Sequence, residues 1–277
     1  MSQSLAKVKH IVAVASGKGG VGKSTTAVNI ACALQAAGYK VGLLDADLYG
    51  PSIPTMLKIG RAEEMDESLI VPPLSEQGLK VISVSMFSSP EKAQILRGPM
   101  AGNMVKQFLT HVAWGELDYL ILDYPPGTGD IQLTISQTAP LTGALIVTTP
   151  QTVALNDVQK TISMFDTLKV PLLGILETMS YFVCSGCEMK HYLFSQNGAR
   201  TLSERFGIPL LGEIPIDPDV SRGGDSAKPI VSSETRGSLV ARKYFDAADS
   251  LVREIKVLEQ QKGSALLSFQ LKWQKGS

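Results

Sequence analysis

The chain has 277 residues, of which 44% are hydrophobic and 19% charged, a composition that supports one large core and excludes an intrinsically disordered chain. Its 26 Lys and Arg residues balance its 26 Asp and Glu residues, so we expect no nucleic-acid partner, which would require a basic excess. Three cysteines make no disulfide framework, and no apolar stretch approaches the ~20 residues that cross a bilayer, so a soluble cytoplasmic protein without a membrane partner is predicted.

Apolar, β-branched runs alternate with segments of helical period along the chain. In chain order, the runs predict strands at 10–15, 40–45, 80–86, 118–123, 143–148, 172–176 and 210–214. The helical period predicts helices at 25–37, 103–112, 131–137, 155–165 and 238–258. Strands that are apolar throughout and separated by helices are covered on both faces, which predicts an α/β fold with a doubly wound, mostly parallel sheet. We expect one domain over residues 1–262, followed by a tail at 263–277.

A glycine-rich segment between the first predicted strand and helix carries a phosphate-binding motif. It fits the pattern G-x-x-x-x-G-K-[ST] with Gly17, Lys18, Gly19, Gly20, Val21, Gly22, Lys23, Ser24 and Thr25. Its glycines let backbone N–H groups surround phosphate oxygens, and the helix N-terminus adds partial positive charge. Lys23 is predicted to neutralise the β- and γ-phosphates, and the Ser24 hydroxyl to bind Mg²⁺. A glycine-rich turn with a chance lysine is the alternative.

Lys18 is unusual, because an ordinary phosphate loop needs no second lysine there. It is either a solvated surface charge or a group that reaches phosphate in a facing subunit. The loop from Lys18 to Thr25 resembles that of the MinD/ParA/nitrogenase-iron-protein superfamily. That resemblance implies a nucleotide-dependent dimer in which each Lys18 acts on the opposite subunit, and it gives a P-loop NTPase fold.

Three acidic residues stand at the ends of predicted strands. Asp45 and Asp47 end the second strand, and Asp123 ends a later one, so all three border the crevice where ligands bind in open sheets. Asp123 fits the acid that holds Mg²⁺ through water. The superfamily pattern implies that Asp47 orients the attacking water and that Asp45 lies nearer the metal. Each could instead cap a helix or a turn.

Four stretches narrow the resemblance: LDADLYGPSIP, DYPPGTGDIQLT, MSYFVCSGC and GEIPIDPDV. Over about residues 8–231 they resemble the Mrp/ApbC-type iron–sulfur carrier ATPases. The resemblance implies an ATP-hydrolysing homodimer that passes a [4Fe–4S] cluster to iron–sulfur apoproteins. The resemblance also implies that Pro215 and Asp217 lie near the base of the nucleotide. At position 178 this chain has threonine where the family has asparagine, which weakens recognition of the base by that residue.

Cys184 and Cys187 form a C-x-x-C pair in a loop near residues 180–193. A four-coordinate site needs two more ligands, and a two-fold axis would supply them as the second subunit's cysteines, giving four thiolates for [4Fe–4S] or zinc. Cys32 is expected in the core, and His191 is expected to be an ordinary surface histidine. Two unliganded thiols remain an alternative. A thioredoxin-like redox pair is disfavoured because no helix starts after the first cysteine.

The motifs together predict a homodimeric ATPase that binds and transfers an iron–sulfur cluster. A MinD/ParA-like positioning switch is the alternative, but it would require a basic amphipathic helix or a basic face. Electron donation, as in the nitrogenase iron protein, is a third possibility.

The C-terminal tail has a different period from the helix before it. Leu267, Phe269, Leu271 and Trp273 alternate with polar residues, which predicts an edge strand in this subunit or a neighbour. A disordered tail is the alternative, and a membrane-seeking helix fits worse.

Overall fold

A seven-stranded sheet forms the centre of the protein in a computed structural model that describes residues 4–47, 50, 52–59, 63–65, 69–87, 98–232 and 237–263. The strand order is β11-β8-β7-β1-β6-β2-β5, and every neighbouring pair is parallel, which confirms the predicted doubly wound sheet. The strands are β1 (Val8–Ser16), β2 (Val41–Asp45), β5 (Lys80–Ser83), β6 (Leu117–Asp123), β7 (Gly143–Thr148), β8 (Leu172–Glu177) and β11 (Leu210–Glu213).

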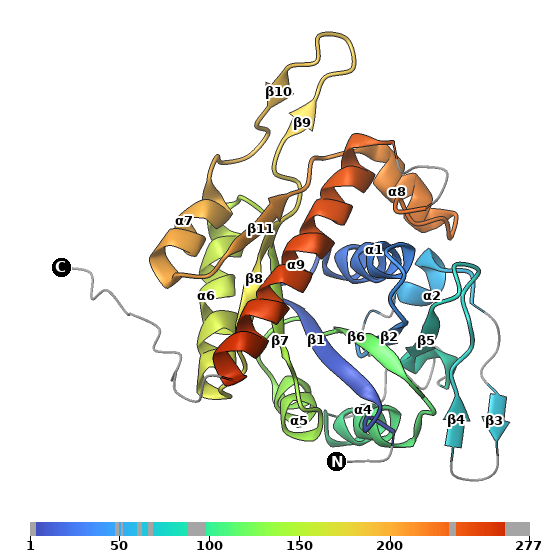
Figure 1. The fold of residues 1–277 in the computed structure, drawn as a ribbon. Helices are drawn as coiled ribbons and strands as arrows, with labels where there is room; N and C mark the ends of the chain where they lie inside the picture. The colour runs from blue at the N-terminus through green and yellow to red at the C-terminus, as the bar shows by residue number, and fades with distance from the viewer. Residues whose placement is uncertain are drawn as a thin grey trace.

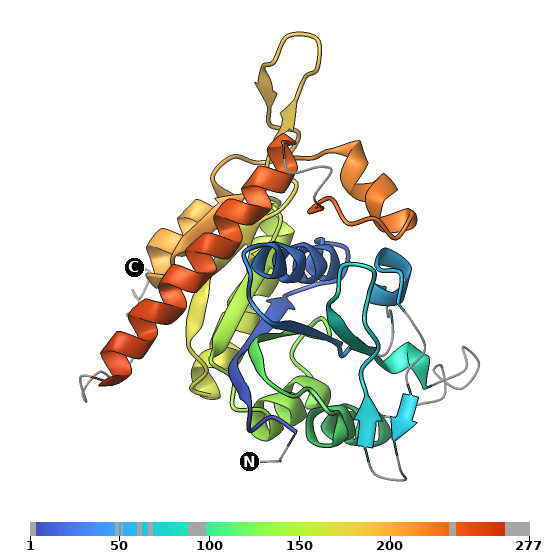
Figure 2. The ribbon, with the colours of Figure 1, turned by 45° about the vertical axis from the view of Figure 1, so that its right-hand side comes forward.

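Helices cover both faces of this sheet (Figures 1 and 2). Side chains alternate along β1, so that Ile11 and Ala13 enter one apolar layer while Val12 and Val14 enter the other. The first layer is completed by α4 (Gly98–His111), α5 (Asp130–Thr138), α6 (Thr152–Thr167) and α7 (Gly198–Phe206). The second is completed by α1 (Lys23–Ala36), α2 (Ile53–Met56), α8 (Pro218–Asp225) and α9 (Leu239–Gly263).

The long helix α9 packs against α1 and the sheet. The stripe predicted for it is confirmed, because the following side chains are all buried: Val240, Tyr244, Ala247, Leu251, Ile255 and Leu258. None of the helices in the described ranges is long and apolar enough to cross a membrane. The predicted strand at 267–273 lies outside the described residues.

The strand predicted at 80–86 is wrong over its last three residues. There the chain forms the 3-10 helix η1 (Val84–Met86), because the Ser83 hydroxyl accepts a hydrogen bond from the Ser85 backbone N–H and caps the turn. Helix α4 begins at Gly98, five residues before the predicted start, with Pro99 in the first turn where its missing N–H costs nothing.

Two short hairpins lie outside the main sheet. One pairs β3 (Glu63–Met65) with β4 (Leu69–Val71), and the other pairs β9 (Phe182–Val183) with β10 (Lys190–His191). Figures 1 and 2 both show the β9–β10 hairpin projecting from the body of the protein. The sequence predicted neither hairpin, nor the helices α2, α7 and α8.

Candidate functional site

The predicted phosphate loop connects the carboxyl end of β1 with the first turn of α1. Gly20 and Gly22 have φ of 78° and 79°, the left-handed region that favours glycine. At Gly17, a Cβ atom would lie 2.6 Å from the backbone nitrogen of Val158 in α6, so only glycine fits this approach. Helix α1 has no side-chain cap at its N-terminus, which leaves its first backbone N–H groups for phosphate oxygens.

The predicted acids reach this loop because their strands are neighbours. Strand β6 lies between β1 and β2, and the register sets Asp123 opposite Val14 on one side and Asp45 on the other. Asp47 follows two residues beyond the end of β2. The carboxyl edge of the sheet therefore brings all three carboxylates beside the phosphate loop, where open α/β sheets bind ligands.

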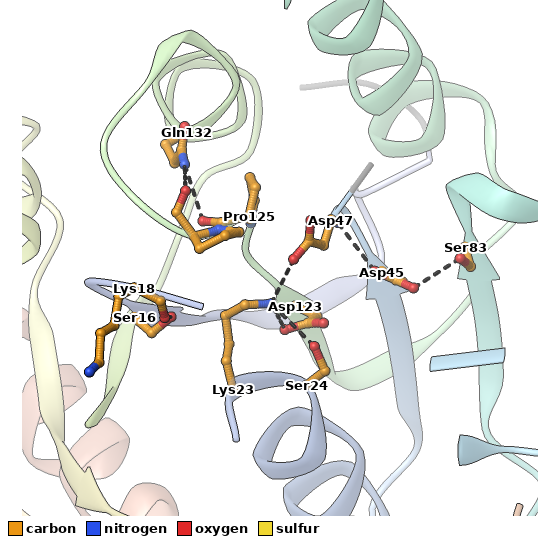
Figure 3. Close-up of polar contacts among 11 residues, drawn as sticks. Ser16, Lys18, Lys23, Ser24, Asp45, Asp47, Ser83, Asp123, Pro125 and Gln132 are labelled. Atoms are coloured by element: carbon orange, nitrogen blue, oxygen red, sulfur yellow. Dashed lines mark hydrogen bonds and ion pairs between the residues drawn. The ribbon is translucent and has the colours of Figure 1, made fainter. Parts of the chain in front are cut away.

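Lys23 is the centre of a buried ionic cluster (Figure 3). Its Nζ atom donates a hydrogen bond to Asp123 Oδ1 at 2.6 Å and lies 3.5 Å from Asp47 Oδ2. It also donates to Ser24 Oγ at 3.3 Å. The Lys23 side chain is 6% exposed and that of Asp123 is fully buried, so each charge depends on the other for compensation.

Asp45 is held within the same corner by the protein itself. Its Oδ1 accepts a hydrogen bond from the Asp47 backbone N–H at 3.2 Å, and its Oδ2 accepts one from the Ser83 hydroxyl at 2.9 Å. Burial, and after it the neighbouring Asp123 carboxylate, raises the pKa of Asp45 to about 7. Burial also raises the pKa of Asp123, and the charge of Lys23 opposes that rise.

This corner has the donor set of a magnesium site. Asp123 Oδ2 is buried and has no hydrogen-bond partner among the described residues. The Ser24 hydroxyl lies beside the same cluster, and a carboxylate with a hydroxyl matches the hard oxygen ligands that Mg²⁺ prefers. Both Asp45 oxygens already accept hydrogen bonds from the protein, so Asp123 and Ser24 are better placed to bind the ion directly.

Lys18 lies apart from this cluster. Figure 3 shows its side chain directed away from Lys23 and the carboxylates, while the Ser16 hydroxyl donates to its backbone oxygen at 2.9 Å. Within the part of the chain that the structure describes, Lys18 forms no ion pair. This geometry suits a lysine that serves a group outside its own phosphate site.

Gln132 is a functional candidate that the sequence analysis missed. Its Nε2 donates to the backbone oxygens of Pro125 and Pro126 at 3.1 and 2.8 Å (Figure 3). Its Oε1 accepts from the Gly129 N–H at 2.9 Å. One buried side chain thus fixes the loop that follows Asp123. Only the Gln132 half of a capping box is present at the start of α5, because the N-cap residue Gly129 has no side chain, so the usual sequence signature is absent.

A cavity of about 500 Å³ opens beside the phosphate loop, a size typical of small-molecule sites. Pro215 and Asp217, which the family resemblance placed near the base, both line it, as does Thr178. Asp217 also caps α8, because its Oδ1 accepts a hydrogen bond from the Asp219 N–H at 2.8 Å. The cavity and the phosphate loop together could hold one nucleotide.

Thr178 connects this cavity with the phosphate loop. Its hydroxyl is buried and donates to the Val21 backbone oxygen at 2.6 Å, with the Thr148 backbone oxygen 3.0 Å away. With its one proton directed at backbone oxygens, the side chain fastens the end of β8 to the loop. The sequence had raised only the question of base reading at this position.

The C-x-x-C pair occupies the turn of the β9–β10 hairpin. Cys184 and Cys187 are free thiols, and backbone N–H groups of Gly186 and Cys187 hydrogen-bond to the Cys184 sulfur and lower its pKa. Cys32 is buried in α1, as predicted, and burial raises its pKa to about 12. The hairpin therefore presents the two cysteines that the sequence singled out.

His191 joins this pair. One of its ring nitrogens and the two sulfurs of Cys184 and Cys187 all lie within 4.8 Å of one another. The sequence analysis treated His191 as an ordinary surface histidine, because the pairing that brings it back to the cysteines is not visible in the spacing alone. The structure thus places three potential metal ligands of one chain together.

Comparison with known proteins identifies a family to which most of the chain is similar. The profile of the ParA family, described as NUBPL iron-transfer P-loop NTPase, matches residues 7–252. An iron-sulfur cluster carrier protein of Aquifex aeolicus is 47% identical over 246 residues, which cover 88% of this chain and 67% of that protein.

Solved structures agree with this placement. A nucleotide-binding protein from Archaeoglobus fulgidus in complex with ADP superposes with a TM-score of 0.74 at 39% identity, covering 88% of this chain and 94% of that one. The cell division ATPase MinD of Pyrococcus furiosus gives a TM-score of 0.66 at 20% identity, covering 88% and 98%, and it shares the fold alone.

Proposed function

The chain belongs to the family of NUBPL iron-transfer P-loop NTPases, and from that premise we propose that it is a homodimeric ATPase that carries an iron–sulfur cluster to apoproteins. The observation that carries the proposal is the short distance in sequence between the two sites. Thr178 contacts the phosphate loop, and Cys184 stands only six residues further along the same segment.

At the nucleotide site, ATP phosphates enter the loop and attract Lys23 away from Asp123. When bound, Mg²⁺ would supply Lewis-acid stabilisation of the phosphate charge, held by Ser24 and Asp123. Asp47 orients the attacking water, and Asp45 supports it through the hydrogen bond to the Asp47 N–H. The base lies in the cavity beside Pro215 and Asp217.

Nucleotide state reaches the hairpin through two segments that run side by side. The Ser180 N–H donates to the Ile214 oxygen at 3.0 Å, and the Ile216 N–H donates to the Tyr181 oxygen at 2.7 Å. Ile214 and Ile216 also line the base cavity. A ligand that shifts this lining therefore shifts the strand that leads into β9, which is how ATP binding and hydrolysis change the position of the cysteines.

The cargo needs two protomers. A [4Fe–4S] cluster takes four thiolates, and each chain offers Cys184 and Cys187 on a projecting hairpin, so a two-fold axis completes the set. Because these cysteines must stay reduced to bind iron, we place the protein in a reducing compartment such as the cytoplasm. Client apoproteins receive the cluster from the exposed tip.

Anaerobic reconstitution with iron and sulfide tests this function. The wild type and a Cys32→Ala control are expected to gain iron–sulfide charge-transfer absorption and about four irons per two chains, whereas Cys184→Ala gains neither. Incubation with a cluster-free ferredoxin should then transfer the absorption to the recipient. A wild-type protein that gains no iron-dependent absorption, or a Cys184→Ala variant that keeps it, would contradict the proposal.

A further inference from the structure

The β9–β10 hairpin of a single protomer brings together three side chains with the chemistry of a transition-metal site. Two are thiols and the third is an imidazole, and the ligand atoms of Cys184, Cys187 and His191 lie within 4.8 Å of one another. The geometry holds within one chain, so it does not depend on how two protomers meet.

The hairpin register explains why His191 is close. His191 pairs with Phe182 and Lys190 pairs with Val183 across the antiparallel ladder. The Cys184 N–H then donates to the Met189 oxygen at 3.0 Å, and the Glu188 N–H donates to the Cys184 oxygen at 2.8 Å, which closes the turn. The second strand therefore returns alongside the first, and its His191, opposite Phe182, lies two positions along the ladder from Cys184.

The base of the hairpin fixes this register. Tyr181, just before β9, is buried, and the Lys190 ammonium lies 4.5 Å from the centre of its ring. The ring of Tyr192 lies 6.3 Å from that of Tyr181 on the other side of His191 in the sequence. Residues on both sides of His191 thus pack on one anchored aromatic ring, which fixes the backbone at the histidine.

We propose that each protomer alone binds one divalent, thiolate-preferring metal ion through Cys184, Cys187 and His191, with the fourth coordination position open. Two thiolates and a neutral imidazole cancel the charge of such an ion, and binding releases the two thiol protons to solvent. Cys187 and His191 are exposed, so the open position faces solvent and can accept an incoming thiolate.

This inference rests on the proposed function only in that both use the same two cysteines. A cluster that bridges two protomers and an ion bound by one protomer compete for Cys184 and Cys187. His191 belongs to the single-protomer site alone, because the bridged cluster already has four thiolates. The histidine therefore separates the two sites experimentally.

The test is an anaerobic titration of the nucleotide-free, full-length protein with Co²⁺, followed by its d–d absorption and competition with a chromophoric chelator. We expect one Co²⁺ per chain with tetrahedral thiolate character, and binding at least about tenfold weaker in His191→Ala. A His111→Ala control, at an exposed histidine in α4, should bind as the wild type does. His191→Cys should restore affinity by supplying a third thiolate. Equal affinity in wild type and His191→Ala, or one ion per two chains, would overturn the proposal.

Iron–sulfur reconstitution of the same variants distinguishes failure of this inference from failure of the proposed function. His191→Ala should load the cluster as the wild type does while losing Co²⁺ affinity. If wild type binds Co²⁺ through His191 but loads no cluster, the carrier function fails and the metal site stands. If His191→Ala loads cluster and also keeps full Co²⁺ affinity, the metal site fails and the carrier function stands.

Discussion

At the scale of single residues, Lys23 is the centre of the candidate nucleotide site. Its ammonium lies 2.6 Å from Asp123 Oδ1, in a corner where both side chains are buried. In the nucleotide-free protein the Lys23 ammonium compensates the charge of the Asp123 carboxylate. A bound phosphate would compete with Asp123 for the hydrogen bonds of this ammonium. On the proposed function, the same side chain compensates Asp123 in the nucleotide-free protein and binds phosphate in the complex.

Replacing Lys23 by glutamine removes the charge but keeps a hydrogen-bond donor for Asp123. We expect ATP binding to be lost, because the β- and γ-phosphates lose their neutralising cation, while the fold survives. Calorimetric titration with ATP measures the loss, and thermal unfolding checks the fold. Lys106→Ala, an exposed lysine of α4, is the control and should bind ATP normally. Unchanged ATP affinity in Lys23→Gln would show that this lysine has no part in phosphate binding.

Asp45 gives the stability of the protein a particular pH dependence. Its folded pKa of about 7 lies above the usual 3.8, so between these values the native state holds a proton that the unfolded chain has released. The free energy of unfolding therefore decreases as pH rises from about 4 to about 7, because deprotonating Asp45 costs more in the folded protein than in the unfolded chain.

Asp45→Asn should remove this contribution and flatten the profile over that window. Urea unfolding at several pH values, without Mg²⁺ or nucleotide, measures the difference between variant and wild type. Asp249→Asn, at an exposed position of α9, should retain the wild-type profile. Parallel profiles for wild type and Asp45→Asn would refute the raised pKa.

At the scale of secondary-structure elements, the phosphate loop can pack against α6 only because Gly17 has no side chain. A methyl group on Gly17 would meet the α6 backbone, whereas one on Gly19 has open space within 4 Å. Gly17→Ala is therefore expected to destabilise the nucleotide-free protein by about 1–3 kcal/mol through overpacking. Gly19→Ala should leave it within about 0.5 kcal/mol.

Urea unfolding of the two alanine variants compares them within the same loop and without a change in charge. Equal stabilities would mean that α6 shifts to accept the methyl group without cost. A loss confined to Gly17→Ala would identify the loop–α6 contact as the structural reason for glycine there.

The sequence predicted the regular elements well where the pattern of apolar residues was long. The strands of the main sheet and the buried stripe of α9 follow from periodicity, because a run of five or more residues fixes which faces are covered. The phosphate loop and the carboxylates at strand ends follow from motif and topology together. The phosphate loop is a local sequence motif, and the carboxylates meet because parallel strands end at one edge of the sheet, so neither requires knowledge of distant side-chain contacts.

The rest depended on contacts between distant residues. The place of His191 beside the cysteines depends on the register of a hairpin whose strands are two residues long, too short for a periodic pattern to specify. Thr178 fastens β8 to the phosphate loop through its hydrogen bond to Val21, which is 157 positions away in the sequence. The end of β5 depends on the hydrogen bond that the Ser83 hydroxyl accepts from the Ser85 N–H. The periodicity of apolar residues carries no information about such a cap.

At the scale of the whole molecule, Lys18 bears on assembly. A lysine directed away from its own carboxylate cluster contributes little to binding within one protomer, but it can stabilise phosphate charge in a facing one.

Lys18→Ala should therefore keep ATP affinity within about threefold and lower the turnover number by at least about tenfold. We also expect ATP to raise the solution mass of the wild type, as measured by light scattering, and to raise that of Lys18→Ala less. Lys106→Ala again serves as the control. Equal hydrolysis rates for wild type and Lys18→Ala would exclude a role in the partner's site.

Because the strands are parallel, the connections at their carboxyl ends form the site, and the connections at their amino ends can tolerate more changes in sequence. Every segment of the nucleotide site and the hairpin follows the carboxyl end of a strand or a helix start beside it. The connections that lead into the opposite ends of the strands, at 37–40, 139–142, 168–171 and 207–209, take no part in the site. A fluorophore attached there should leave the nucleotide site and the cysteine hairpin unmodified, and short insertions should be tolerated there better than at the carboxyl edge.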